Sequence, residues 1–234
     1  MQLFCFPCAG GTASFFDPLE NDLAGIEVVK LEYSGHGSRH REPLFDSFDA
    51  LSADLFNRLK DRYDGGRYAL FGYSMGSIAL VEVLKHILND PEIGLPRRVF
   101  PAAHEPHSRT EFSDFSPDRL SDEWVKNKTI SFGAVPGKLV DNNSFWRLYL
   151  PLFRADYSMI GNCKFEKLDL KTTVPATVFY SETDTPRKEM ELWKNYFTGA
   201  CEFCCFEGNH FFFRQHHKEM ADIIRNRLER GEDA

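Results

Sequence analysis

The sequence lacks the long apolar runs and basic clusters that mark membrane-spanning and nucleic-acid-binding proteins. No run approaches the roughly 18 apolar residues that a membrane span needs, and no charged-then-apolar leader precedes the first predicted strand. The net charge is -7, and no long Lys/Arg cluster offsets it, which argues against a nucleic-acid partner. We therefore expect a cytoplasmic protein that binds neither a membrane nor nucleic acid.

Glycine-rich phosphate loops and metal-binding knuckles are also missing. Neither G-x-G-x-x-G nor G-x-x-x-x-G-K-[ST] occurs in the chain. Two pairs of cysteines, Cys5-x-x-Cys8 and Cys201-x-x-Cys204, have a spacing used by zinc sites and redox dithiols. Both pairs fall in apolar, strand-like stretches, so we expect reduced, packed thiols, no metal site and no cofactor.

What the chain contains is an alternation of short apolar segments and helical patterns. The predicted strands are Gln2–Phe6, Glu27–Glu32, Tyr68–Gly72, Arg98–Pro101, Ala176–Tyr180 and Glu202–Phe206. The predicted helices are Phe48–Arg62, Met75–Leu88, Lys188–Tyr196 and His216–Arg230. This order predicts an α/β fold, with a mainly parallel central sheet flanked by helices, in a single domain over residues 1–234.

The alternation is interrupted between residues 104 and 173, where no convincing strand occurs and Asp122–Ile130 and Phe145–Ile160 have helical patterns. This stretch is too long for an ordinary crossover. We therefore expect an inserted helical lid over approximately residues 104–173. Inserted caps of this kind cover active sites and shape the substrate channel.

Ser74 lies at the centre of the most informative motif, a G-x-S-x-G pentapeptide over residues 72–76. A predicted strand precedes it and a predicted helix follows it. At such a turn a serine is strained and its Oγ is exposed at the edge of the sheet, while the flanking glycines prevent clashes. The pentapeptide in this context predicts a nucleophile.

A serine nucleophile needs a base, and the base needs an orienting carboxylate. In α/β-hydrolases these follow the serine in the order acid, then histidine. Asp184 follows the predicted strand that ends at Tyr180, and His210 follows the one that ends at Phe206. Both loops lie at the strand ends where the serine turn is expected, so we predict a Ser74–His210–Asp184 triad.

Other readings of these residues stay open at this point. Asp184 also fits the cap of a helix that begins near Arg187, and Glu182 is the nearest competitor for the acid. The competing histidines are His36 and His40 in an early loop, and His216 and His217 at a solvated helix start.

The loop after the first strand contains Cys8-Ala9-Gly10-Gly11, whose glycines allow close approach of backbone to a substrate. In this fold the oxyanion hole uses the N–H after the nucleophile and one from an early loop. Met75 and Ala9 are therefore the predicted donors, with Cys8 as the adjacent choice. A plain Gly-Gly turn is the alternative.

These pieces together resemble the type II thioesterases, stand-alone α/β-hydrolases that accompany nonribosomal peptide and polyketide synthases. The matching segments, which span nearly the whole chain in family order, are residues 3–11, 72–76, 150–157 and 208–212. The Arg154-Ala155-Asp156 segment is the most specific for this family, because it lies in the predicted lid and general esterases do not share it.

The chain departs from the family pattern in three loops. Ser34-Gly35-His36-Gly37 replaces the usual Pro-Gly-Arg-Gly, and Ala103-His104-Glu105 replaces Ser-Gly-Arg. The acid loop, residues 181–184, is less glycine-rich than usual. No triad member is removed, but the changes lie where substrate and partner would be recognised.

The resemblance implies that this chain is a monomeric serine thioesterase. It would clear acyl groups from the phosphopantetheine thiol of acyl or peptidyl carrier proteins through an acyl-serine intermediate, without a cofactor of its own. A general carboxylesterase or acyltransferase, or a non-catalytic carrier-binding module, are the alternatives. The candidates for lining an acyl channel, whose spacing also fits core packing, are Phe132, Phe145, Trp146 and Phe153.

Overall fold

The computed structural model describes residues 1–106, 120–163 and 170–229. Its centre is a six-stranded sheet in the order β2-β1-β3-β4-β5-β6, and every adjacent pair is parallel. The strands are β1 (Gln2–Phe6), β2 (Glu27–Lys30), β3 (Tyr68–Tyr73), β4 (Val99–Ala102), β5 (Ala176–Tyr180) and β6 (Cys201–Cys205). The prediction of a mainly parallel sheet is confirmed, with every predicted strand present.

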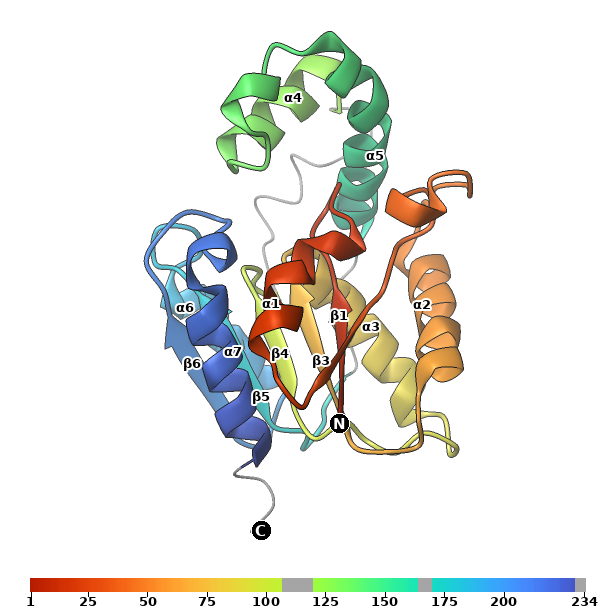
Figure 1. The fold of residues 1–234 in the computed structure, drawn as a ribbon, viewed down its shortest axis with the longest axis vertical. Helices are drawn as coiled ribbons and strands as arrows, with labels where there is room; N and C mark the ends of the chain where they lie inside the picture. The colour runs from red at the N-terminus through yellow and green to blue at the C-terminus, as the bar shows by residue number, and fades with distance from the viewer. Residues whose placement is uncertain (107–119, 164–169, 230–234) are drawn as a thin grey trace.

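Helices cover both faces of this sheet (Figure 1). One face carries α2 (Phe48–Arg62) and α3 (Met75–Leu88), and both have the bounds that the sequence predicted. The other face carries α1 (Asp17–Asp22) and α7 (Phe213–Glu229). Helix α1 was not predicted from the sequence, because six residues are too few to show a helical period.

Of the four helices predicted outside residues 104–173, two differ from those observed. The predicted helix Lys188–Tyr196 is a short α6 (Arg187–Met190) followed by a 3₁₀ helix, η7 (Glu191–Asn195). The predicted helix at His216 begins earlier, at Phe213, and Arg230 lies outside the described residues.

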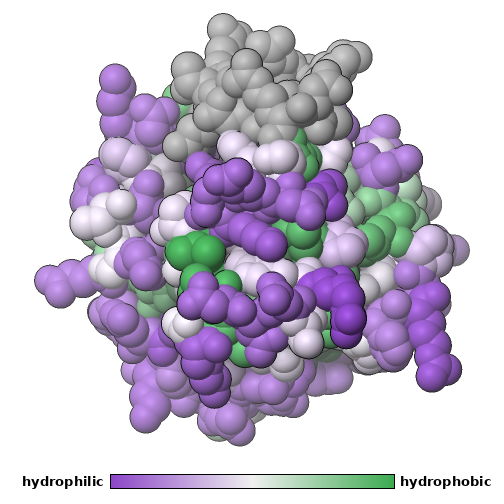
Figure 2. Space-filling view, turned by 90° about the horizontal axis from the view of Figure 1, so that it is seen from above, coloured by the Kyte–Doolittle hydropathy of each residue, from purple (hydrophilic) through white to green (hydrophobic). Residues whose placement is uncertain are grey.

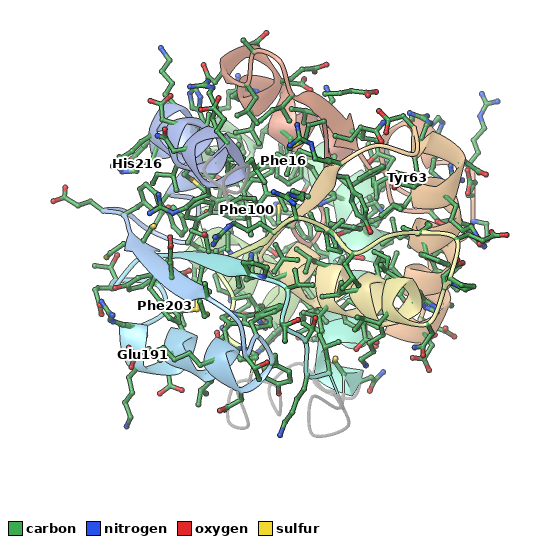
Figure 3. The ribbon with its side chains drawn as sticks, turned by 90° about the horizontal axis from the view of Figure 1, so that it is seen from below. Phe16, Tyr63, Phe100, Glu191, Phe203 and His216 are labelled. Carbon is green, nitrogen blue, oxygen red and sulfur yellow. The ribbon has the colours of Figure 1, made fainter. Side chains whose placement is uncertain are left out.

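The side chains of each strand alternate between two apolar clusters, one on each face. Phe4 and Leu70 belong to the cluster under α2 and α3, whereas Phe71 and Phe100 belong to the cluster under α1 and α7. Seen from below (Figure 3), Phe16 and Phe100 lie inside the molecule, and both are fully buried. The inner strands β1, β3, β4 and β5 are buried along their whole length, which explains why they are nearly continuous apolar runs rather than alternating.

Between β4 and β5 the described residues form α4 (Asp122–Ser131), a 3₁₀ helix η5 (Gly137–Leu139) and α5 (Asn143–Asn162), which stand above the sheet in Figure 1. Ser121 caps α4 and Asn142 caps α5, each accepting a backbone N–H three residues on. Of the predicted lid range 104–173, residues 107–119 and 164–169 lie outside the described part.

The surface at this end is mainly hydrophilic with apolar patches between the polar side chains (Figure 2). Leu148 on α5 is the most exposed large apolar side chain of the described residues, at 63%. None of the helices in the described ranges is long and apolar enough to cross a membrane.

Candidate active site

The chain turns sharply at Ser74, between β3 and α3. Ser74 has φ 55° and ψ -121°, a strained conformation for a residue with a side chain. The glycines on either side make the turn possible. A Cβ on Gly76 would lie 1.9 Å from Phe6 O, and one on Gly72 would lie 2.2 Å from Gly76 O. Close backbone contacts therefore require glycine at both positions.

His210 and Asp184 lie beside Ser74. His210 Nε2 is 2.9 Å from Ser74 Oγ, and His210 Nδ1 is 2.9 Å from Asp184 Oδ1. When the carboxylate accepts the Nδ1–H, Nε2 is free to accept the proton of the serine hydroxyl. Parallel strands bring the three residues together, because β3, β5 and β6 all end at the same edge of the sheet. The three residues thus have the geometry of a nucleophile, base and orienting acid.

Neither alternative for the acid loop, Glu182 as the acid or Asp184 as a helix cap, fits the structure. Glu182 Oε2 accepts a hydrogen bond from Arg187 N at 3.4 Å and does not contact His210 in the described structure. The cap residue of α6 is Pro186, so Asp184 does not cap that helix. The capping alternative for Asp184 is therefore wrong.

The competing histidines are engaged elsewhere. His40 and His216 contact backbone carbonyls at exposed positions, and His217 Nδ1 lies 2.5 Å from Asp22 Oδ2. His36 is buried and lies against Asp156. None of the four contacts Ser74 among the hydrogen bonds of the described residues.

A cavity of about 100 Å³ opens beside the serine. Ser74, His210 and Asp184 line it together with Ala9, Cys8 and Phe132. Ala9, which was predicted as an oxyanion donor, thus borders the cavity beside Ser74. Met75 is the first residue of α3, whose leading N–H groups have no acceptor within the helix.

A second cavity of about 260 Å³ adjoins the first and shares Cys8 and Ala9 with it. Of the predicted channel aromatics, Phe132 lines the first cavity, and Phe145 and Phe153 line the second. Trp146 lines neither. Its indole Nε1 donates to Val140 O at 2.7 Å, and the side chain is 4% exposed.

Ala103 and His104 also line the first cavity, although neither was predicted individually as a site residue. Ala103 has φ 54°, which favours glycine. Ala103 belongs to the segment that replaces the family's Ser-Gly-Arg. This departure from the family pattern was the signal that could have identified Ala103 as a residue of the site. Burial lowers the pKa of His104 to about 4, so this imidazole is neutral at pH 7.

A buried pair of a histidine and an aspartate lies next to the loop that carries Ala9. His36 Nε2 is 3.0 Å from Asp156 Oδ2, and that same oxygen accepts a hydrogen bond from Gly10 N at 2.6 Å. Both side chains are almost inaccessible, at 2% and 0% exposure. The contact between His36 and Asp156 was not predicted from the sequence, because it joins residues far apart in the chain.

All six cysteines are free thiols, but Cys205 is exposed rather than packed. Cys5 and Cys8 are buried, and burial raises the pKa of both thiols, that of Cys8 to about 12. Such thiols remain protonated and unreactive at neutral pH. Cys8 therefore borders the cavity as an apolar side chain.

The model of the thioesterase domain family matches residues 1–228. The chain is 32% identical over 219 residues to a probable cadicidin biosynthesis thioesterase of Streptomyces griseus, an alignment that covers 92% of this chain and 59% of that relative. The chain thus spans less than two thirds of that protein.

Solved structures share the fold over nearly the full length. ClbQ from the colibactin NRPS/PKS pathway has a TM-score of 0.88 at 24% identity, over 99% of this chain and 98% of ClbQ. The type II thioesterase BorB from the borrelidin biosynthetic cluster has a TM-score of 0.81 at 25% identity, over 97% and 92%. The predicted α/β-hydrolase fold is confirmed, and the chain belongs to the thioesterase domain family.

Proposed function

We propose that this chain is a serine thioesterase that hydrolyses acyl groups from the phosphopantetheine thiol of carrier proteins. The observation that carries the proposal is the hydrogen-bonded series Ser74, His210 and Asp184 at a cavity, in a chain of the thioesterase domain family. Ser74 is the nucleophile, His210 the general base and Asp184 the residue that orients His210.

The reaction proceeds in two steps. His210 Nε2 takes the proton of Ser74 as Oγ attacks the thioester carbonyl, and the N–H groups of Met75 and Ala9 stabilise the oxyanion. Collapse of the intermediate breaks the C–S bond, and His210 returns the proton to the leaving thiol. Water then attacks the acyl-serine with His210 again as base, which releases the acid and restores Ser74.

The carrier-bound substrate is supported by the names of similar proteins. The 32% identical relative is named for cadicidin biosynthesis, and BorB belongs to the borrelidin cluster. Thioesterases of this type edit, removing stalled or wrong acyl groups so that the carrier thiol is free again. The enzyme acts as a cytoplasmic monomer, and its partner supplies the phosphopantetheine.

The segment 104–173 acts as a lid over this site within a single domain. In support, α5 and the segment that follows α4 contribute side chains to both cavities: Phe132 and Tyr157 to the first, and Phe145 and Phe153 to the second. Aromatic walls of this kind suit an acyl chain. Trp146 packs behind them against Phe145 and Phe153 and supports the wall from within.

The test compares an acyl-phosphopantetheinyl carrier protein with the matching simple oxygen ester. We expect the higher kcat/KM for the carrier substrate and no turnover of either substrate by Ser74→Ala. A preference for the simple ester would instead indicate a general carboxylesterase, and acyl transfer to an added alcohol or amine would indicate an acyltransferase. Carrier binding without any hydrolysis by the wild type would leave only a binding module.

A further inference from the structure

The loop that carries Ala9 is tied to the rest of the molecule at both ends. Tyr33 Oη donates to Pro7 O at 2.7 Å, which fixes the start of the loop. Gly11 N donates to Cys8 O at 3.0 Å, which closes a β-turn with Ala9 and Gly10 at its corner. Gly10 has φ 64°, as the third residue of such a turn can require. The orientation of the Ala9 N–H therefore depends on how this corner is held.

Helix α5 holds the corner by two side chains one turn apart. Asp156 Oδ2 accepts the Gly10 N–H at 2.6 Å. The ring of Phe153 lies so close that a Cβ on Gly10 would be 2.0 Å from Phe153 Cε1. A helix of the segment between β4 and β5 therefore sets the position of the peptide that follows Ala9.

His36 holds Asp156 from the other side, and its hydrogen bonds define its protonation state. Nε2 faces Asp156 Oδ2 at 3.0 Å and Nδ1 faces Ser34 O at 3.0 Å. Both partners are acceptors, and only the imidazolium can donate from both nitrogens at once. Among the described residues Asp156 Oδ1 has no hydrogen-bond partner, so a positive neighbour is what stabilises this buried carboxylate.

The other titratable groups around His36 are consistent with a charged pair. Glu32 accepts from Ala13 N and Ser38 N, which joins the Ala9 loop to the His36 loop, and its charge also favours the imidazolium. Burial raises the pKa of Tyr33 and that of Cys8, so both are neutral at pH 7.

We propose that Asp156 and His36, held as carboxylate and imidazolium, are a positioning pair that fixes Gly10 so that the Ala9 N–H points into the oxyanion hole. This inference rests on the proposed function, because Ala9 is the oxyanion donor in that mechanism. Neither residue contacts the reacting atoms. The pair acts through the loop and links the helix of the lid to the stabilisation of the oxyanion.

The test uses Asp156→Asn, which keeps an oxygen for Gly10 N but removes the charge, and His36→Gln. Ser52→Ala is the matched control, because Ser52 is also buried and hydrogen-bonded to a histidine, but this bond joins Ser52 on α2 to His86 on α3 at 3.1 Å, away from the Ala9 loop. Three quantities are measured at pH 7.5: kcat and KM for a small acyl thioester, the Ki of an alkyl boronic acid, and the Ki of an uncleavable thioether analogue. The boronic acid adds to Ser74 as a tetrahedral mimic of the oxyanion intermediate.

For both test variants we expect kcat to fall about 10- to 100-fold, since removing one oxyanion donor outright costs roughly 100- to 1,000-fold and a displaced donor costs less. The boronic acid Ki should rise by the same factor, while KM and the thioether Ki stay within about threefold. Ser52→Ala should leave all of these values within about twofold of the wild type. If Asp156→Asn does not fold, the same kinetic and inhibition measurements on His36→Gln test the proposal.

An unchanged boronic acid Ki in folded variants would overturn the proposal, even if kcat fell. Equal losses of boronic acid and thioether affinity would also overturn it, because they would indicate general damage to the cavity. Boronic acid binding needs no turnover. A wild type that binds the boronic acid but hydrolyses no thioester would therefore refute the proposed function and leave the positioning test intact.

Discussion

The charged state of His36 predicts a specific dependence of stability on pH. Burial alone lowers the pKa of His36, but the charge of Asp156 and the hydrogen bonds to Asp156 and Ser34, with a smaller effect of Glu32, outweigh it and raise the pKa to about 9. In the unfolded chain the pKa is near 6.5. His36 therefore stabilises the fold fully below about pH 6.5, and this contribution is lost as the pH rises through about 9.

The magnitude follows from the difference between the two pKa values. At 1.36 kcal/mol per unit, the shift from 6.5 to about 9 corresponds to about 3 kcal/mol of unfolding free energy. In a chain of this length that is a change in Tm of about 10 °C.

Urea denaturation of the wild type and His36→Gln at pH 6.5 and pH 9.5 measures this contribution. The quantity to compare is the difference in unfolding free energy between wild type and mutant at each pH. Burial raises the pKa of thiols such as Cys5 and Cys8, which lowers stability at alkaline pH equally in both proteins, and the difference removes this effect. We expect the stability advantage of the wild type over His36→Gln to be about 3 kcal/mol larger at pH 6.5 than at pH 9.5. A gap of the same size at both pH values would refute a charged His36–Asp156 pair.

Three further substitutions, together with Gly137→Ala as a control, test the site and the turns around it. Asp184→Asn should lower kcat by about 10,000-fold, because the imidazole loses its useful tautomer, with an unchanged Tm; a loss below tenfold would contradict the role of Asp184. Ala103→Gly should keep or raise stability by up to about 1 kcal/mol, since φ 54° strains alanine; a clear fall in Tm would contradict this. Gly76→Ala should cost about 3 kcal/mol or more, because its Cβ would meet Phe6 O, whereas Gly137→Ala, with nothing within 4 Å, should be nearly neutral.

The local patterns of the sequence were sufficient for the sheet and for the positions of Ser74, Asp184 and His210. Buried parallel strands are continuous apolar runs, and their carboxyl ends meet at one edge, so residues just after three strands could be placed near each other without a structure. The bounds of α2 and α3 were also predictable, because both helices show a long amphipathic period.

Contacts between distant segments were not predictable in this way. The pairing of His36 with Asp156 spans 120 positions and depends on how α5 lies over the loop after β1. The different positions of Phe145 and Trp146 relative to the cavity were also not predictable from the sequence. These neighbours on one helix have the same aromatic character, yet one lines a cavity and the other packs behind it.

In the proposed mechanism an acyl group passes from a carrier thiol to Ser74 and then to water. Intact-mass spectrometry of the enzyme mixed with an acyl-phosphopantetheinyl carrier protein, quenched in acid at short times, detects both transfers. We expect a transient enzyme species heavier by the acyl group, with the added mass on the peptide that contains Ser74, and a carrier returned to its free-thiol mass. Loss of the acyl group from the carrier at an undiminished rate with Ser74→Ala would refute this mechanism.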